Sequence, residues 1–295
     1  MELRQLEYFV AVAEHLHFGR AAAALSIGQP AVSQQIARLE RELGVALFDR
    51  SGRTVRLTDA GSRLVVEAHA VLAAVDRARA AVLAPDGRDQ PPVLRLGSST
   101  GMGDRLGAVL RALREHLPAT DVVLTSAPTQ ARLEQVLSGQ LDGAFVRGVE
   151  AARGIELIEV WRDRLLVALP AGHPLAGRAV VDLRELADIP LRITPRRLNQ
   201  PLVDLVTNAC AAAGFVPVLA PHLDTLDNSL ATIGAGPPSW TVVYEAQARV
   251  LRPPLVAFRP VRPDLVMPTA LAVRADAASR AIAPLLRACA AADQG

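Results

Sequence analysis

The sequence predicts a multidomain protein with an all-α winged helix-turn-helix domain, a long linker helix and an α/β region over the rest of the chain. Three observations predict this. Apolar residues recur at three- and four-residue steps within residues 1–58, which indicates short helices before a hairpin. A regular apolar seam follows from residue 59. From residue 93 on, strand-like and helix-like segments alternate, which is typical of a parallel sheet covered by helices.

Three short helices are expected within residues 1–43. The apolar stripe of the first consists of Leu3, Leu6, Phe9, Val10, Ala13 and Leu16. An alanine-rich run over residues 20–25 predicts the second helix. The third starts near Pro30, since proline is tolerated in a first helical turn. Its apolar face consists of Val32, Ile36, Leu39 and Leu43. This face should dock the third helix on the first two.

The opposite face of the third helix is polar and suits nucleic acid. It carries Ser33, Gln34, Arg38 and Arg41. Hydroxyl, amide and guanidinium groups can read base edges or bind phosphates, so this helix is expected in the major groove of DNA. The alternative is a small helical bundle without this role. Net charge does not decide, because residues 1–66 hold 8 arginines and 7 acidic residues.

A basic wing is predicted directly after the third helix. Residues 45–50 and 53–57 can pair as short strands around the turn signal Ser51-Gly52. The wing carries the three cations Arg50, Arg53 and Arg56. Such a loop beside a recognition helix can reach the DNA backbone or the minor groove.

The helix expected over residues 59–84 carries a heptad seam. Its positions are Leu64, Ala68, Val71, Val75, Ala78 and Val82. Because this spacing is the one that joins two helices, it predicts dimerisation, which would set two recognition helices about one DNA turn apart on a roughly palindromic site. Packing of this helix on its own domain is the alternative. Pro85 and Pro91-Pro92 mark its end and the exit from it.

Alternating segments fill the C-terminal region. Strands are expected at residues 93–97, 122–124, 141–146, 165–169, 190–193, 215–218, 241–244 and 270–273. Helices are expected at residues 104–116, 130–138, 200–213, 225–234 and 277–291. The first strand ends at Ser98-Ser99-Thr100 just before a helix. Helix N-termini at the carboxyl ends of parallel strands favour anionic ligands.

Composition argues against an enzyme. All 32 basic residues are arginine, which excludes Schiff-base lysine chemistry. The chain has no phosphate-binding loop, no nucleophile elbow and no histidine or cysteine spacing of a metal site. No catalytic residue, metal or cofactor is therefore expected. Cys210 and Cys289 are expected to be buried thiols. Without an apparent signal peptide or a membrane-length apolar run, a cytoplasmic location and no membrane association are expected.

The N-terminal segment resembles the LysR-type transcriptional regulators. The matching stretches are LRQLEYFVAVAE, FGRAAAALSIGQPAVSQQIARLERELGVALFDR and VRLTDAG. The resemblance implies that DNA is contacted by Gln29, Pro30, Ser33, Gln34 and Arg38, and from the wing by Arg53, beside Arg50. Gly28 departs from the serine or threonine usual at its position, so the helix start loses a side-chain cap.

A weaker resemblance to the same family covers the rest of the chain, through VLRLGSSTG, GQLDGAFVRG, RLLVALPAGHPLA and TALAVRADA. It implies two α/β lobes like those of a periplasmic solute-binding protein, with crossings near residues 161–164 and 266–269. The expected domains are residues 1–58 for DNA binding, 59–92 for the dimerisation helix and hinge, 93–162 with 268–295 for lobe 1, and 163–267 for lobe 2.

The family resemblance also implies an effector site between the lobes. From lobe 1 it names Ser98, Ser99, Thr100 and Thr129, and Arg147 could balance an anionic ligand. From lobe 2 it names Ile193, Thr194 and Pro195. One departure bears on this wall: Gly236-Pro237-Pro238-Ser239-Trp240 replaces the usual direct run into a strand, so the wall should be reshaped. Trp240 and Tyr244 could line the pocket or pack in the core.

The expected protein is thus a regulator that binds a palindromic DNA operator as a homodimer or homotetramer and responds to a small molecule, with an anionic effector favoured. RNA polymerase would be a further partner if the protein activates transcription. Two alternatives stay open at this point. One is a regulator with a vestigial cleft that responds to a protein partner, and the other is a metabolic protein that binds small molecules.

Overall fold

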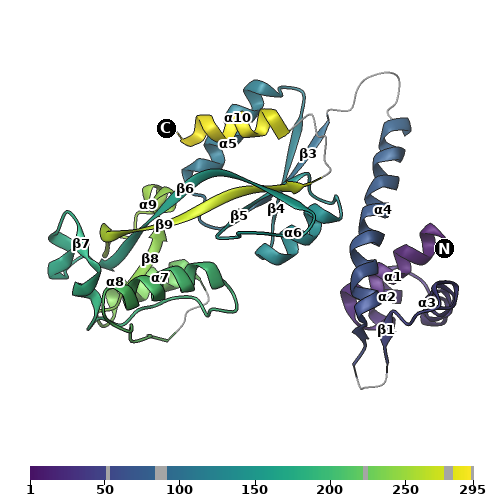
Figure 1. The fold of residues 1–295 in the computed structure, drawn as a ribbon, viewed down its shortest axis with the longest axis horizontal. Coiled ribbons are helices and arrows are strands. Elements are labelled where there is room, and N and C mark those ends of the chain that lie inside the picture. Colours follow the sequence, from purple (N-terminus) through teal and green to yellow (C-terminus); the bar gives the residue numbers. More distant parts are fainter. Residues whose placement is uncertain (51–53, 84–91, 222–224, 276–281, 294–295) are drawn as a thin grey trace. The chain divides into compact units, whose positions relative to one another are not determined.

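The computed structural model describes residues 1–50, 54–83, 92–221, 225–275 and 282–293 (Figure 1). The chain divides into two units. The first comprises Met1–Pro92 and the short stretch Leu133–Asp142, and the second comprises Val93–Arg132 and Gly143–Gly295. No helix of the described residues is long and apolar enough to cross a membrane.

The first unit begins with three helices: α1 (Leu3–His15), α2 (Phe18–Ala24) and α3 (Gln29–Leu43). The ring of His17 caps α2 by accepting hydrogen bonds from two backbone amides, whereas Gly28 begins α3 without a side-chain cap. Three of the four predicted apolar positions of α3 are buried, and Leu43 is exposed. The apolar side chains of α1, α2 and α3 form one core with Phe48 of the wing, so the expected docking face is confirmed.

The wing is shorter than expected. Within the described part of the wing, pairing is limited to β1 (Phe48–Asp49) and β2 (Arg56–Leu57), which are antiparallel, with Phe48 opposite Leu57. Residues 45–47 lead from α3 into the wing instead, because the amide of Leu47 is bound by a side chain of α3 rather than by a strand. Arg53 lies outside the described residues.

Helix α4 (Asp59–Leu83) covers the predicted linker helix. Its first half packs on its own domain, since Ala68 is buried in the core of the first unit and Leu64 lies against that core. Further along, Val71 and Ala78 are exposed. The seam therefore serves two purposes: its first positions hold α4 on the domain, and later positions face away from it. The side chain of Val82 lies outside the described residues.

The second unit is built on one mixed sheet with strand order β4-β3-β5-β9-β6-β8. β3 (Val93–Ser98) runs parallel to β4 (Asp121–Ser126) and β5 (Gly143–Arg147). The expected parallel pairing holds for these three strands, whereas β9 (Val256–Arg274) is antiparallel to both β5 and β6 (Ile155–Pro170). β8 (Thr241–Tyr244) is antiparallel to β6.

β6 and β9 are long strands that run through both lobes (Figure 1). Their pairing is continuous across both expected crossings, with Trp161 opposite Thr269 and Arg164 opposite Val266. The register shifts between Glu159 and Trp161 and again between Leu165 and Leu166. We use the expected boundaries, residues 93–162 with 268–295 and residues 163–267, to name lobe 1 and lobe 2.

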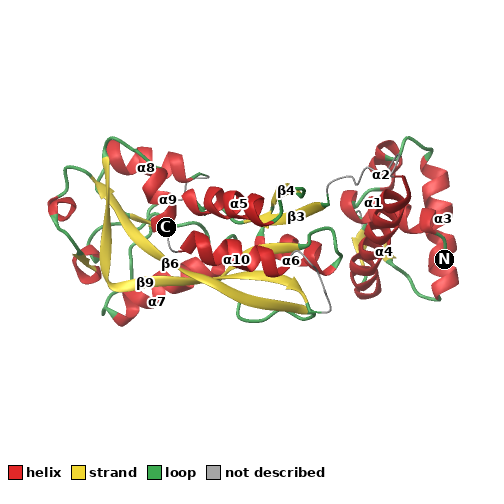
Figure 2. Ribbon diagram, turned by 90° about the horizontal axis from the view of Figure 1, so that it is seen from above, coloured by secondary structure: helices red, strands yellow, loops and turns green. Residues whose placement is uncertain are grey.

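Helices α5 (Asp104–His116) and α10 (Ile282–Asp293) lie against each other on lobe 1 (Figure 2). Their apolar faces share a core with β3, β5 and Phe145, whose ring stacks on Trp161 at a centroid distance of 5.4 Å. α6 (Thr129–Leu137) precedes β5. The predicted helix 104–116 is confirmed by α5. Its sequence is amphipathic, and the helix begins directly after Gly103.

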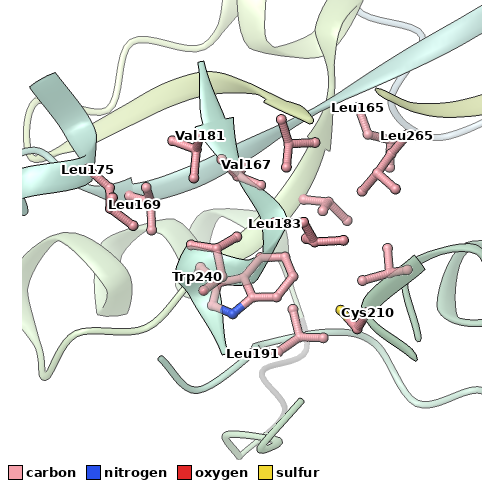
Figure 3. Close-up of a cluster of buried hydrophobic side chains, with 14 of the residues drawn as sticks. Leu165, Val167, Leu169, Leu175, Val181, Leu183, Leu191, Cys210, Trp240 and Leu265 are labelled. Carbon is pink, nitrogen blue, oxygen red and sulfur yellow. The ribbon is translucent and has the colours of Figure 1, made fainter. Parts of the chain in front are cut away.

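Lobe 2 packs its helices and short segments around the far ends of β6 and β9. These segments are η2 (Pro174–Gly177), β7 (Val181–Asp182), η3 (Leu183–Leu186), α7 (Gln200–Ala212), α8 (Leu226–Ala235) and α9 (Glu245–Val250). Trp240 lies at the centre of their core, fully buried (Figure 3). Its indole Nε1 donates to the carbonyl of Ile189 at 2.9 Å, so Trp240 is a core residue.

The strands expected at residues 190–193 and 215–218 do not form. Leu191 alone makes single parallel bridges to Leu219 and Trp240. Pro190 and Pro217 lack the N–H that a ladder requires, which shortens both segments to isolated bridges. The loop that carries Ile193, Thr194 and Pro195 therefore has no regular secondary structure.

Candidate DNA-binding face and ligand cavity

The polar face of α3 is accessible at its N-terminal end. Gln29 and Pro30 occupy the first two helical positions and are exposed, as is Gln34 one turn later. Ser33 is half-buried at the edge of the same face. These four predicted positions thus lie together on the first two turns of the helix, where side chains of a recognition helix meet base edges.

Arg38 is exposed but already has acidic partners. Its Nε donates to Glu42 at 2.9 Å, and its guanidinium also pairs with Glu2 at 3.4 Å. Glu42 further pairs with the N-terminal amine at 2.7 Å. Hydrogen bonds from that amine, from Gln5 and from Arg38 lower the pKa of Glu42 to about 2. A DNA phosphate at Arg38 would have to compete with these carboxylates.

Glu40 anchors the wing, a role that the sequence patterns did not reveal. Its Oε1 accepts hydrogen bonds from the backbone amides of Leu47 and Phe48 at 2.8 and 3.1 Å. Its Oε2 pairs with Arg50 at 3.0 Å. The Arg50 guanidinium also lies 4.7 Å from the centre of the Phe18 ring. Arg50 is therefore held within the domain, and a DNA contact by it stays a prediction.

A cavity of about 470 Å³ opens between the loop after β3 and lobe 2. Its size suits a small organic molecule. It is lined by Thr100, Gly101, Arg192, Ile193, Thr194, Leu198, Asn199, Leu202, Thr225, Leu226, Ser229, Thr241, Val242, Val243, Tyr244 and Gln247. Three predicted residues, Thr100, Ile193 and Thr194, are brought together here. Pro195 is not among the lining residues.

The other hydroxyls predicted for lobe 1 bind within the protein. Ser98 Oγ donates to the carbonyl of Thr125, and Ser99 Oγ accepts from Arg147 at 3.2 Å. Thr129 Oγ1 accepts from the buried Arg132 at 3.1 Å. Burial, and secondarily the charge of Arg147, lower the pKa of Arg132 to about 10. Ser98, Ser99 and Thr129 are not among the residues that line the cavity.

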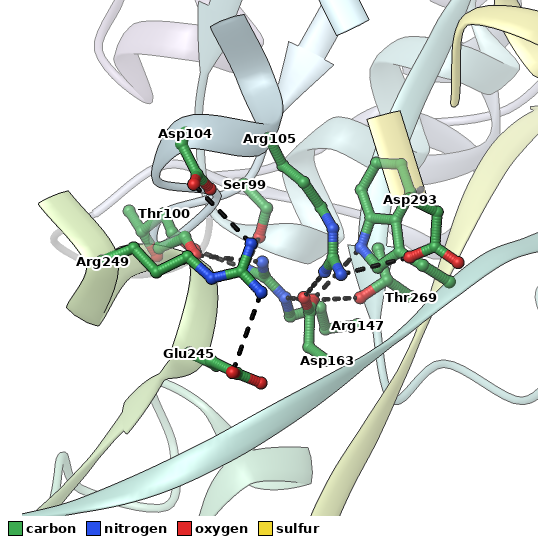
Figure 4. Close-up of polar contacts among 12 residues, drawn as sticks. Ser99, Thr100, Asp104, Arg105, Arg147, Asp163, Glu245, Arg249, Thr269 and Asp293 are labelled. Atoms are coloured by element: carbon green, nitrogen blue, oxygen red, sulfur yellow. Dashed lines mark hydrogen bonds and ion pairs between the residues drawn. The ribbon is translucent and has the colours of Figure 1, made fainter. Parts of the chain in front are cut away.

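Arg147 is the centre of a buried polar cluster rather than a free counter-ion (Figure 4). Its Nε donates to Asp163 Oδ2 at 2.7 Å, and its other nitrogens donate to Ser99 Oγ and to the carbonyls of Thr100 and Gly101. The guanidinium carbon lies 4.0 Å from the centre of the Tyr244 ring. Its charge is thus compensated inside the protein, which argues against direct balancing of an anionic ligand.

Asp163 collects donors from three further side chains. Thr269 donates at 2.6 Å and the indole of Trp161 at 3.3 Å, and Arg105 forms a second ion pair with it. Arg105 also pairs with Asp293 at 3.1 Å. Because β6, β9, α5 and α10 each contribute a member, this cluster ties the crossing point of the long strands to the helices of lobe 1.

Tyr244 forms the floor of the cavity on the side of this cluster. Burial raises the pKa of its hydroxyl. Gly101, with φ +79°, approaches its ring so closely that a Cβ there would come within 2.7 Å of the Tyr244 ring. Any other residue at position 101 would therefore push the β3 loop away from the cavity floor.

Arg192 is the charged residue of the cavity, and the sequence patterns missed it. The one available signal was a charged residue within a run of apolar and turn residues, PLRITP, after an expected strand. Among the described residues, no group of three or more acidic, histidine or cysteine side chains could hold a metal ion. Both cysteines are buried, and burial raises the pKa of Cys210 to about 11 and that of Cys289 to about 12.

Comparisons with known proteins cover both units. Residues 3–62 match the family described as bacterial regulatory helix-turn-helix protein, lysR family, and residues 87–294 match the LysR substrate binding domain. The regulator ShiR of Corynebacterium glutamicum is 36% identical over 238 residues, 80% of each chain.

Two solved structures are similar over almost the whole chain. Full-length CbnR complexed with its target DNA has a TM-score of 0.70 and 27% identity, covering 99% of this chain and all of that one. A cysteine mutant of OxyR from Corynebacterium glutamicum, bound to H2O2, has a TM-score of 0.61 and 25% identity, covering 99% of this chain and 94% of that one.

Proposed function

Because this chain belongs to the LysR family of DNA-binding transcriptional regulators, we propose that it binds a pseudo-palindromic operator as an oligomer and that a small organic molecule in the 470 Å³ cavity controls this binding. The cavity carries the proposal. A ligand can shift a regulator between two arrangements only if it binds them with different affinity. Since the cavity has walls from both lobes, a change in their angle changes the contacts that a ligand makes.

The proposed division of labour follows the predicted boundaries. Residues 1–58 would bind DNA, residues 59–92 would pair two copies and lead into the hinge, and the two lobes would hold the effector. In the DNA-binding domain, Gln29, Pro30, Ser33 and Gln34 are best placed for base contacts, since they are accessible on the first two turns of α3. Operator DNA lies in the bacterial cytoplasm, so we propose that the protein acts there, with RNA polymerase as a partner where it activates.

Exposed apolar side chains in three places support an oligomer. On α4, Val71 is exposed beyond the part that packs on its own domain. On the second unit, the edge strand β4 exposes Val123 and Leu124, and the loop of lobe 2 exposes Val216 and Val218. An uncovered edge strand with apolar side chains favours pairing with another chain. We propose that a second copy of this protein covers these surfaces, and Val123→Asp should lower the mass measured by light scattering.

The similar structures include a peroxide-bound OxyR, but a thiol sensor is not the function that this chain supports. The thiolate is the species that reacts with peroxide. Both thiols here are buried with raised pKa values, so little thiolate forms at neutral pH. A vestigial cleft is also disfavoured, because the cavity is open to a ligand and has both apolar and polar walls. No residue constellation of the described part of the chain supports an enzyme, and the relatives carry the names of regulators.

DNA binding is tested with the intergenic DNA upstream of the protein's own gene. The full chain should bind it at physiological salt at least about a thousandfold more tightly than random DNA. Gln34→Ala should lower this discrimination by about 1–3 kcal/mol, the worth of a good base contact. Gln35→Ala is the matched control, since its side chain is turned about 100° away on the same helix. Equal binding to both DNAs would contradict operator recognition. An equal loss of discrimination in the two variants would show that the face with Gln34 is not the one that reads the bases.

A further inference from the structure

Arg192 lines the cavity, and uncharged hydrogen-bond acceptors hold its guanidinium group. Its Nε donates to Ser239 Oγ at 3.0 Å, and its Nη1 donates to the carbonyl of Pro221 at 3.0 Å. Its backbone amide donates to the carbonyl of Trp240 at 2.7 Å, which fixes the main chain beneath it. A guanidinium has five N–H donors, so these two side-chain bonds leave donors for a ligand.

The cavity has a positive charge that no described carboxylate compensates. Arg192 is the one charged residue among the described lining residues, and within the described part of the chain it makes no ion pair. Arg147 differs, since Asp163 neutralises it. The helix N-termini of α7 and α8 open at the same cavity through their capping residues Asn199 and Thr225. Helix N-termini add a partial positive charge to that of the guanidinium.

The segment that departs from the family pattern places this arginine. Ser239 is almost fully buried, and its hydroxyl donates to the carbonyl of Pro237 at 3.4 Å. The hydroxyl proton is thus directed away from Arg192, which leaves a lone pair of Ser239 Oγ for the guanidinium Nε. The Pro237-Pro238 turn therefore acts from behind the lining residues, because it holds the hydroxyl that orients the cation.

We propose that Arg192 binds the anionic group of the effector and that this group is a carboxylate on a small, partly apolar organic molecule. Planar guanidinium donors match the geometry of a carboxylate. The apolar body of the ligand would lie against Leu202, Leu226 and Val243. Ser239 is a positioning residue in this arrangement, since it acts through Arg192. The inference rests on the proposed function, and it places the anion on lobe 2 rather than beside Arg147.

The test uses the full-length protein and a panel of small organic carboxylates, each paired with its primary amide, together with neutral alcohols, sugars and nucleosides. Thermal shift identifies binders, and calorimetry measures their affinity. A carboxylate should bind the natural protein at least about tenfold more tightly than its amide, which corresponds to a hydrogen bond to a charged group. Arg192→Gln should abolish this preference, and Arg192→Lys should keep part of it. Ser239→Ala should reduce it.

Arg184→Gln is the matched control, because Arg184 is an exposed arginine of lobe 2 whose ion pair with Asp182 lies outside the cavity. It should leave the preference unchanged. Unfolding midpoints show whether each variant is folded. Carboxylate binding that survives Arg192→Gln would overturn the inference, and so would neutral binders without any carboxylate binder, although the proposed function would then stand. If no compound of either kind binds, the effector function fails and the inference with it.

Discussion

Replacing Asp163 by asparagine should destabilise the second unit strongly. Asp163 is 1% exposed and lies between the guanidinium groups of Arg147 and Arg105. The substitution preserves the size of the side chain but removes its charge, and an amide nitrogen takes the place of one acceptor oxygen. Arg147, 7% exposed, would then be a buried cation without a counter-ion.

The magnitude follows from the cost of breaking a buried ion pair by removing one partner, about 3–5 kcal/mol. A change of about 1 kcal/mol shifts the unfolding midpoint of a domain of this size by about 2–4 °C. The expected shift is therefore about 6–20 °C. Because the chain has two units, thermal unfolding should be followed by both far-ultraviolet circular dichroism and tryptophan fluorescence, since Trp161 and Trp240 both lie in the second unit.

Asp264→Asn is the matched control. Asp264 pairs with Arg164 at 2.6 Å, but both side chains are more than half exposed, so its loss should cost no more than about 1 kcal/mol. If Asp163→Asn shifts the tryptophan transition no further than Asp264→Asn does, the buried cluster does not hold the second unit together, and the reasoning is refuted.

Three further predictions concern single groups. Glu40→Ala should lower the free energy of unfolding of the first unit by about 1–3 kcal/mol, because two backbone amides and Arg50 lose their acceptor. Chemical denaturation measures this free energy, and an unchanged value in the variant would contradict the prediction. Since the pKa of folded Glu42 is about 2, below its ordinary 4.5, its stabilising effect is present above pH 4.5 and is lost as the pH falls towards 2. The difference in unfolding midpoint between the natural protein and Glu42→Gln should shrink over this range, and a constant difference would argue against it. Cys210 and Cys289 should react slowly with a thiol reagent at about pH 8, below both raised pKa values, until urea unfolds the protein; fast reaction of either in the folded state would show that it is not buried.

The sequence predicted the helices of the first unit well because their signals are local. Apolar spacing and Pro30 in a first turn each act within a few residues. The predicted apolar face of α3 is buried apart from Leu43 for this reason. The wing was overestimated, since its length depends on Glu40, whose partners lie seven and eight residues away.

In the second unit, long-range contacts decided more. Periodicity cannot distinguish a strand that ends at a crossing from one that runs through it, so only residues 165–169 of β6 and residues 270–273 of β9 were predicted as strand. Arg147 was predicted as a ligand group because its partner Asp163 is 16 residues away and gave no pattern. Arg192 was overlooked for the converse reason: its orientation comes from Ser239, 47 residues later.

The paired β6 and β9 have a mechanical consequence. Two lobes joined by flexible loops could swing freely, whereas lobes that share a continuous two-stranded ribbon can change their angle only by twisting or bending that ribbon. The register shifts at Glu159/Trp161 and Leu165/Leu166 interrupt the ladder on either side of Asp163, and such irregularities bend a strand and increase its local twist. Asp163, with its ion pairs to Arg105 and Arg147, lies between these two irregularities. A ligand that draws Arg192 towards lobe 1 would have to bend or twist this span against the ion pairs of Asp163.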